Sequence, residues 1–358
     1  MVKTLRSFGT ILLLSAITCF GNVCSAQSLQ TWNGSFNNGK GALSFTMVGT
    51  DPSQTNQTTT ITAYLVPIKV TFSDNTSFDP GPLVETIVAS PVLCGGSAPC
   101  TIDFVQGGID LGVTQYGDAF QRGNFWTTVQ PHPGYHVLLQ TVVLPEQFVN
   151  VSNSDGGTTT FHGMKVGWIS EGYFHTYFET ILLPNLIQSG QVRADGVVLP
   201  VTRDVCKAIS TTCQGWGHHG FVQVTGFNPQ TYAWFSYVDP SGMTGPQDVD
   251  VLSHEVGEWI DDPLDNNPSG CGGGGTLEVG DPLDGAFEGG PPHDYAYNVN
   301  GVVYHLQDLV WLPYFGETLV TSAGRQFSFQ GESLTVCQNG SARIHHGGPL
   351  QARQKRFR

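Results

Sequence analysis

The run TTTITAYLVPIKVTF at residues 58–72 limits what this chain can fold into more than any other segment. It is rich in β-branched and aromatic residues, which favour extended backbone. Turn-forming clusters flank it, DPSQTNQ before it and SDNTSFDPG after it. The run therefore predicts a strand, and the surrounding chain from about 27 to 91 predicts antiparallel sheet. Composition agrees, because Gly 45 and Pro 21 in 358 residues suit strands and loops better than long exposed helices.

Later segments add helices to this β-rich start. TQYGDAFQRGNFW at 114–126 predicts a helix that Thr114 can cap, with one face formed by Tyr116, Ala119, Phe120 and Gly123. Further strand or buried segments are expected at YHVLLQTVVLP, TYFETILLPNLI and YAWFSYV. One helix is expected to begin near Val249 and to stop at Asp-Asp-Pro. The fold class predicted is α+β, with a β-rich region 27–131, an α+β region 132–340 and a disordered basic tail 341–358.

The first 26 residues predict a secretory signal. Lys3 and Arg6 supply a positive end, ILLLSAITCF a short apolar core, and VCSA a small-residue exit, so we expect cleavage after Ala26. No later run approaches the roughly 20 apolar residues that a membrane helix needs. The mature chain is therefore expected to be secreted, periplasmic or extracellular, with no membrane span.

The cysteines fit that compartment. Removal of the signal leaves six, an even number in an oxidising environment, which favours disulfides. The simplest pairing joins the two pairs that are close in sequence and leaves a third for a longer loop: Cys94 with Cys100, Cys206 with Cys213, and Cys271 with Cys337. A zinc ribbon needs two short Cys-x-x-Cys knuckles, and the sequence has none.

The charge balance excludes one group of partners. Lys+Arg 15 against Asp+Glu 29 gives a net charge of -14, and basic residues cluster only at 353–358. Nucleic acids and anionic membrane surfaces attract basic proteins, so neither is an expected partner.

The segment SHEVGEWIDDP at 253–263 carries the strongest chemical signal. On a helix, His254 and Glu258 are four residues apart and project from one face, where both can reach one cation. Glu255 occupies the position at which zinc metallopeptidases of the His-Glu-x-x-His type place their general base. Glu258 stands where those enzymes have a second histidine. A carboxylate there still suits zinc but tilts the preference toward Mn²⁺ or Ca²⁺.

A third metal ligand is available downstream. Glu278 in LEVGDP lies twenty residues after Glu258, the spacing of the thermolysin-like gluzincins, so the region 132–340 resembles a zincin with one central active-site helix. Asp281 can either hydrogen-bond His254 or ligate the metal directly. The alternative interpretation is a structural cluster of helix-capping and surface charges. Asp261 and Asp262 at the helix end would then need a cation or hydrogen bonds.

Other polar residues are candidates for stabilising an oxyanion across a cleft. His305 is the catalytic candidate, in a set with Tyr304, His293 and Tyr297. The pair His218 and His219 in GWGHHGF is interpreted as polar residues of a Gly-rich turn, since neighbours on an extended chain face opposite sides.

Residues 215–311 resemble the secreted phosphate-induced, EXORDIUM-like proteins of plants and their bacterial and fungal relatives. SHEVGEWIDDPLDN is similar to that family's His-Glu helix followed by Asn/Asp-Pro-Leu, LEVGDP to its Glu-Ile-x-Asp segment, and DYAYNVNGVVYHLQDLVW to a Tyr-Asn-x-Asn-Gly segment ending near a Gln. GHHG is a weaker match to its Gly-Tyr-His motif. The resemblance implies an extracellular or envelope protein and transfers His254, Glu255, Glu258, Glu278 and Asp281 as a unit. The family's cysteine after Glu-Ile-x-Asp is absent here, so the resemblance implies no disulfide scheme.

Two hypotheses follow. The first is an exported metal-dependent hydrolase of the gluzincin metallopeptidase type, with zinc, or alternatively manganese or calcium, acting on a peptide or protein substrate. The second is a non-catalytic extracellular or cell-envelope protein on a zincin-like scaffold. It would use the cluster for a structural ion and bind cell-wall glycan or protein through Trp216, Trp234 and Trp311, although core packing is the expected role of each tryptophan.

Overall fold

The computed structural model describes residues 27–334 except 96–98, 210, 241–244, 270–274, 285–292 and 333. The chain combines strands and helices, and its first half is rich in strands, which confirms the α+β prediction. The expected signal segment 1–26, Cys271, Cys337 and the tail 341–358 lie outside the described residues.

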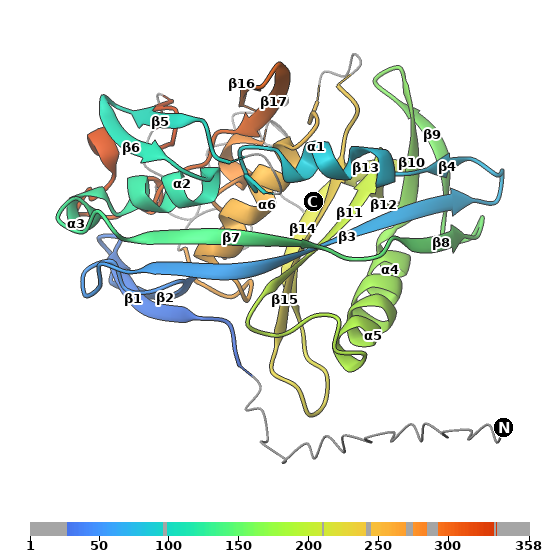
Figure 1. Ribbon diagram of the computed structural model, residues 1–358, viewed down its shortest axis with the longest axis horizontal. Helices are drawn as coiled ribbons and strands as arrows, with labels where there is room; N and C mark the ends of the chain where they lie inside the picture. Colours follow the sequence, from blue (N-terminus) through green and yellow to red (C-terminus); the bar gives the residue numbers. More distant parts are fainter. Residues whose placement is uncertain are drawn as a thin grey trace, which may run out of the picture.

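A mixed sheet of seven strands forms the centre of the molecule (Figure 1). Its strand order is β14-β15-β11-β3-β4, and β7 and β8 also pair with β3. The bounds of these strands are β3 Thr58–Phe72, β4 Ser77–Phe78, β7 His136–Val143, β8 Gln147–Val151, β11 Val197–Arg203, β14 Gly217–Val222 and β15 Gln230–Tyr237.

The long predicted strand is β3, but the expectation of antiparallel sheet around it is wrong for its main partners. Strand β3 runs parallel to β7, β8 and β11, and only the short β4 pairs with it in the antiparallel sense. Its parallel partners come from far along the chain, all of them after residue 131, so the sheet joins the two regions that the sequence had separated there. The nearly continuous apolar run AYLVPIKV is typical of a strand that is buried on both faces.

Smaller sheets surround this one. A four-stranded sheet has the order β13-β12-β10-β9, and three hairpins pair β1 with β2, β5 with β6 and β16 with β17. Their bounds are β1 Thr31–Asn37, β2 Ala42–Val48, β5 Asp103–Gln106, β6 Ile109–Val113, β9 Gly156–Phe161, β10 Met164–Ser170, β12 Val205–Ile209, β13 Thr212–Gly215, β16 Asp294–Val299 and β17 Val302–Gln307.

The helices are short apart from two. They are α1 Val84–Val88, α2 Tyr116–Asn124, α3 Trp126–Val129, α4 Glu171–Phe174, α5 Leu183–Gln188 and α6 Asp250–Asp261, with a π-helix at His175–Leu182 between α4 and α5. Short 3-10 turns lie at Gly81–Leu83, Asp281–Leu283, Leu312–Phe315 and Ala323–Arg325. Among the described helices, none is long and apolar enough to cross a membrane.

Two apolar clusters hold these layers together. The larger contains residues of α2, α6 and several strands, and the smaller lies between the sheet and α4–α5. All twelve residues of α6 are buried, so both its apolar face and its polar face lie in the interior of the protein. Helix α6 contacts β14, β15, β17, β2 and α2. Trp234 and Trp311 are fully buried and Trp216 is buried, so these three tryptophans pack in the interior rather than present faces to a glycan.

The segment TYFETILLPNLI is helical, and not a strand, and it is buried along one face. Phe174, Phe178, Leu182 and Leu186 recur every four residues and are all buried. That period places them on one helical face, which packs in the smaller cluster. The period-four spacing therefore outweighed the apolar content that had favoured a strand.

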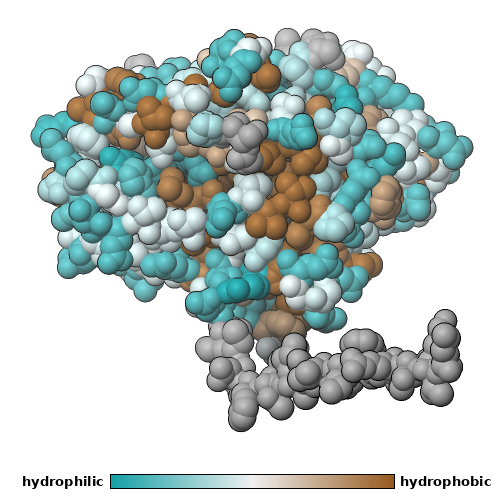
Figure 2. Space-filling model, viewed as in Figure 1, coloured by the Kyte–Doolittle hydropathy of each residue, from teal (hydrophilic) through white to brown (hydrophobic). Residues whose placement is uncertain are grey.

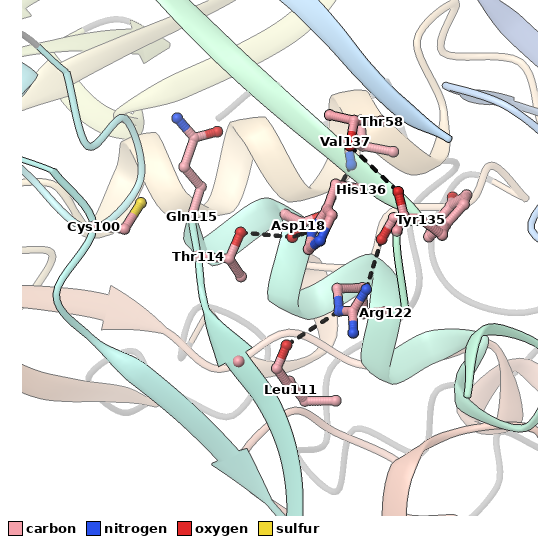
Figure 3. Close-up of polar contacts among 12 residues, drawn as sticks. Thr58, Cys100, Leu111, Thr114, Gln115, Asp118, Arg122, Tyr135, His136 and Val137 are labelled. Atoms are coloured by element: carbon pink, nitrogen blue, oxygen red, sulfur yellow. Dashed lines mark hydrogen bonds and ion pairs between the residues drawn. The ribbon is translucent and has the colours of Figure 1, made fainter. Parts of the chain in front are cut away.

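The predicted helix at 114–126 is α2, but Thr114 does not cap it. Gln115 is the N-cap residue and makes no side-chain cap. The Thr114 hydroxyl instead donates a hydrogen bond to the buried Asp118 carboxylate. The same carboxylate also hydrogen-bonds His136 Nδ1 and accepts the Val137 N–H (Figure 3).

This buried polar network, defined here as the α2 network, extends to Arg122. Its guanidinium donates to the carbonyl oxygens of Leu111 and Tyr135 (Figure 3). The network therefore ties α2 to the start of β7 and to β6 through hydrogen bonds that are all made within the protein.

Both short-range disulfides are confirmed, Cys94–Cys100 and Cys206–Cys213. The second begins in β12 and ends in β13, so it ties the two strands of one hairpin together. On the face shown in Figure 2, polar side chains cover most of the surface and apolar ones gather near its middle.

Candidate metal centre

Helix α6 brings His254, Glu255 and Glu258 into the interior. The helix begins at Asp250 and ends at Asp261, as the sequence predicts. His254 and Glu258 share a face, with His254 Nε2 3.1 Å from Glu258 Oε1. The exposed fractions of His254, Glu255 and Glu258 are 4%, 1% and 2%, so water hardly reaches these three side chains.

The structure adds His219 to this group, and the turn interpretation of GHHG is wrong. Residues Gly217–Val222 form strand β14, at one edge of the central sheet. The two histidines face opposite sides of that strand. His219 Nδ1 lies 3.3 Å from Glu258 Oε2 and 3.7 Å from Glu255 Oε2, while the His218 ring contacts Phe174 on the other side.

The Glu278 side chain also approaches His219 and Glu258, from the segment that begins at residue 275. Its Oε2 lies 3.9 Å from His219 Nδ1, and its Oε1 accepts a hydrogen bond from the Thr276 hydroxyl. Its side chain is 23% exposed, which makes it more open to solvent than the residues of α6. We call His219, His254, Glu255, Glu258 and Glu278 the α6 cluster.

Within the α6 cluster, two groups of side chains have donor atoms that all lie within 4.8 Å of one another. One group is His219, Glu258 and Glu278, and the other is His254, Glu255 and Glu258. The trio expected from sequence, His254 with Glu258 and Glu278, is thus split between the two groups, with Glu258 common to both.

Gln307, at the end of β17, orients His254. Its amide nitrogen donates to the Gly280 carbonyl, so its Oε1 must be the atom that faces His254 Nδ1, at 2.7 Å. His254 Nδ1 therefore carries a proton, and Nε2 is the nitrogen that faces the cluster. Asp281 was the residue expected to make this hydrogen bond. Its Oδ1 lies 3.8 Å from His254 Nε2, which is longer than a hydrogen bond.

Two glycines permit the close approach of these side chains. A Cβ at Gly217 would overlap the Glu255 carboxylate, and one at Gly280 would overlap the His254 ring. Gly280 also donates its N–H to Glu258 Oε1, at 3.1 Å. The backbone at Gly217 and at Gly280 therefore lines the cluster.

The charges in the cluster influence one another strongly. Burial opposes ionisation of Glu258, but the adjacent imidazoles of His254 and His219 hold its pKa well below the usual range. Burial raises the pKa of Glu255, and burial together with Glu258 raises the pKa of Glu278 well above its ordinary value. Burial lowers the pKa of His219, but the facing carboxylates of Glu255 and Glu258 outweigh it and raise that pKa well above the ordinary value.

The donor set fits a divalent metal. Neither carboxylate oxygen of Glu255 accepts a hydrogen bond among the described residues, and His219 Nε2 makes none there either. Buried carboxylates that face one another are costly without a compensating cation or donors. Imidazole nitrogens and carboxylate oxygens without thiolates suit zinc and manganese, and calcium would rely on the carboxylates.

Among the oxyanion candidates, His305 lies on β17, the strand that also carries Gln307. His305 and Gln307 are two residues apart on that strand, so their side chains share a face. Asp248 holds His305, with Oδ2 2.6 Å from Nδ1. Tyr304 points the other way, is buried, and donates to the Thr86 carbonyl.

The two other oxyanion candidates, His293 and Tyr297, contact residues outside the α6 cluster. His293 Nδ1 lies 3.5 Å from Glu332 Oε1, and the Tyr297 ring packs edge-on against Phe104. The structure therefore joins His305 to the side of β17 that touches His254, and gives His293 and Tyr297 other contacts.

The carboxylates at the end of α6 are largely satisfied by the chain itself. The Asp262 carboxylate accepts the N–H groups of Asn266 and Asn267, and Asp261 accepts the Asn124 side-chain amide. Burial raises the pKa of Asp262 to about 6. These hydrogen bonds provide the compensation that negative charge at a helix C-terminus requires.

Two residues of the site escaped sequence reasoning, His219 and Gln307. For His219 the available signal was the alternation in GHHGFV, which fits a strand that presents one histidine to each side. For Gln307 it was the glutamine near the end of the segment DYAYNVNGVVYHLQDLVW. Comparisons with models of protein families, with curated proteins and with solved structures found no match to this chain.

Proposed function

We propose that the protein is a secreted metal-dependent hydrolase that cleaves peptide bonds, on a zincin-like scaffold. The observation that carries the proposal is the convergence of the His-Glu-x-x-Glu helix with His219 and Glu278 in a buried site where no described residue donates a hydrogen bond to Glu255. Such a site combines metal ligands with an adjacent carboxylate, which is the composition of a hydrolytic metal centre.

His254, His219, Glu258 and Glu278 would hold the metal, and zinc is the first candidate, with manganese or calcium as alternatives. A bound divalent ion would polarise a substrate carbonyl and acidify a nearby water. Gln307 supports this role for His254 because it holds a proton on Nδ1, so that Nε2, which faces Glu258, would be the ligand atom.

Glu255 would act as the general base. A base needs a carboxylate that is close to the reacting water and whose pKa lies nearer neutrality than that of an exposed glutamate. Glu255 is buried beside the proposed ligands, its two oxygens accept no hydrogen bond among the described residues, and burial raises its pKa. The glycine at position 217 leaves room for this carboxylate.

His305 would donate a hydrogen bond or proton to the oxygen on which charge develops. Asp248 accepts from its Nδ1 side, and this leaves Nε2 for the substrate. Asp248 also accepts the His305 backbone N–H, so ring and backbone are held by one carboxylate. The arrangement supports a positioned acid on the same face of β17 as Gln307.

Export of the mature chain belongs to the same proposal. The signal-like segment 1–26 and the two disulfides are both typical of chains that fold in an oxidising compartment. A secreted, periplasmic or extracellular hydrolase would meet its peptide or protein substrate there.

The test is to produce residues 27–358 in an oxidising compartment, measure bound metal by mass spectrometry, and screen a peptide library. His254→Ala and Glu258→Ala should each bind less metal than the unaltered chain. Glu255→Gln should retain it while turnover falls by about 10²–10⁴-fold, the usual contribution of a general base. Glu85→Gln makes the same change at an exposed position and should leave both unchanged.

Two outcomes would contradict the proposal. A folded chain without bound metal would refute it. Metal that binds without any cleavage of peptides would favour the alternative, an envelope protein with a structural ion.

A further inference from the structure

We infer that the α6 cluster binds two divalent cations, with the Glu258 carboxylate as the bridge between them. The inference rests on the proposed function, because it specifies how many ions the same site holds. Its starting point is that the two oxygens of Glu258 face different imidazoles. Oε1 lies 3.1 Å from His254 Nε2, and Oε2 lies 3.3 Å from His219 Nδ1.

The donor atoms divide into two sets around this carboxylate. His219, Glu258 and Glu278 form one set, and His254, Glu255 and Glu258 form the other. In each set all donor atoms lie within 4.8 Å of one another, close to the span of the ligands of a single ion. Each set contains one imidazole and two carboxylates. Because Glu255 is the general base of the proposed function, Asp281 would supply the second ligand carboxylate beside His254.

The outer members of the two sets strengthen the division. Glu278 approaches His219, with 3.9 Å between its Oε2 and His219 Nδ1. Asp281 lies on the other side, with Oδ1 3.8 Å from His254 Nε2. Each imidazole thus has its own additional carboxylate, and Glu258 belongs to both sets. Glu255 also approaches His219, with 3.7 Å between its Oε2 and His219 Nδ1, but Glu258 makes the shorter approach to that imidazole.

Charge favours two ions over one. Glu255, Glu258, Glu278 and Asp281 carry four carboxylates into one largely buried space. Two divalent cations would balance four negative charges, whereas one would leave half of them uncompensated in the interior. Glu255 points into this space from α6, is 1% exposed, and has no hydrogen-bond donor on either oxygen among the described residues.

A bridging carboxylate also fits the known spacing of paired catalytic ions. Two-metal hydrolytic sites hold their ions about 3.5–4 Å apart. The two oxygens of one carboxylate can each bind one ion of such a pair. The ligand chemistry, mixed imidazole and carboxylate, suits Mn²⁺ and Zn²⁺.

The experiment strips the chain 27–358 of metal with a chelator and titrates it with Mn²⁺ alone. Bound metal is counted by mass spectrometry after gel filtration, and paramagnetic resonance of the loaded protein detects magnetic coupling between adjacent ions. We expect two Mn²⁺ per chain and a coupled spectrum. His219→Ala and His254→Ala should each fall to one ion with an uncoupled spectrum, and Glu258→Gln should abolish the coupling.

His218→Ala is the matched control, because His218 is adjacent in sequence but faces the other side of β14. It should keep two coupled ions. If a variant fails to fold, the spectrum of the unaltered protein still decides, since coupling requires two ions at short distance.

The outcomes separate the two proposals. One ion per chain in the unaltered protein overturns the bridged pair and leaves the hydrolase proposal intact. No ion overturns both. Two uncoupled ions, or two ions that survive in His219→Ala, place the second ion elsewhere and overturn the bridge.

Discussion

The α2 network and the α6 cluster are both buried and both rich in charge, yet their polar atoms are satisfied in opposite ways. In the α2 network the Asp118 carboxylate accepts three hydrogen bonds, and Arg122 donates to two backbone carbonyls. In the α6 cluster carboxylates face carboxylates, and Glu255 accepts no hydrogen bond among the described residues.

This difference shows what each group of residues contributes. A fully hydrogen-bonded buried network stabilises one arrangement of the chain, because each lost partner leaves a costly orphan. A cluster with unsatisfied carboxylates weakens the fold unless a cation joins it. The α2 network therefore serves stability, and the α6 cluster serves the binding that we propose.

The largest expected effect comes from removing one buried carboxylate from α2 and comparing it with removal of one from α6. Asp118→Ala should lower the free energy of unfolding by about 3–5 kcal/mol, because it leaves Thr114, His136 and the Val137 N–H without their buried partner. Glu255→Ala in metal-free protein should cost about 1 kcal/mol or less, since no described residue loses a hydrogen bond and the lost attraction to His219 is offset by relief of a buried carboxylate beside Glu258. Urea denaturation measures both, and equal losses would break the comparison.

Asp308 tests whether burial alone can make a carboxylate destabilising even when it is hydrogen-bonded. It accepts from the Ser328 hydroxyl and the Gln330 N–H, but burial raises its pKa to about 7. Because the folded-state pKa lies above the unfolded one, the contribution of Asp308 to stability is full below about pH 4 and is lost as the pH rises through about 7.

Asp308→Asn should therefore raise stability relative to the unaltered protein by about 4 kcal/mol at pH 8 and leave it nearly unchanged at pH 4. Thermal unfolding at pH 4, 5.5, 7 and 8 follows the change. A difference that does not vary with pH would show that Asp308 keeps an ordinary titration in the folded protein.

Metal addition should stabilise through the α6 cluster alone. At a free concentration about a hundred times Kd, an ion that binds only the folded chain adds about 2.7 kcal/mol to the free energy of unfolding. Glu258→Gln should lose this gain, whereas Thr114→Val, in the α2 network, should keep it. Thermal unfolding with and without Mn²⁺ distinguishes them, and an equal gain in both variants would place the ion outside the cluster.

The smallest effect concerns a single hydrogen bond of the α2 network. Thr114→Val removes the donor to Asp118 and should cost about 1 kcal/mol. Thr158→Val removes an exposed hydrogen bond to Asp74 and should change stability by less than about 0.5 kcal/mol. Urea denaturation again provides the measurement. If the exposed change costs as much as the buried one, burial adds nothing to the value of that bond.

Local patterns in the sequence predicted those elements whose structure depends on near neighbours. Helix α6 follows from its i, i+4 spacing and its Asp-Asp-Pro end, and the two disulfides follow from cysteines only a few residues apart. Strand β3 follows from its β-branched content, but its parallel partners do not. They are chosen by packing between segments that lie far apart in the chain.

The same limit applies to the site. His254, Glu255 and Glu258 were predictable because one helical turn brings them together. His219 joins them only because β14 docks beside α6, and Gln307 only because β17 does. No local pattern encodes such contacts. The α2 network escaped for the same reason, since Asp118 meets His136 through the pairing of a helix with a strand.

The uneven exposure of the α6 cluster determines how a metal ion could enter and leave it. Glu278 and Asp281 retain access to solvent, while His219, His254, Glu255 and Glu258 are almost completely enclosed. An ion would therefore arrive and depart past the two outer carboxylates, and exchange of an inner ion would wait for local opening of the chain. A protein built this way would retain the ion it acquired on folding, so the ion supply of the compartment where it folds would determine its occupant.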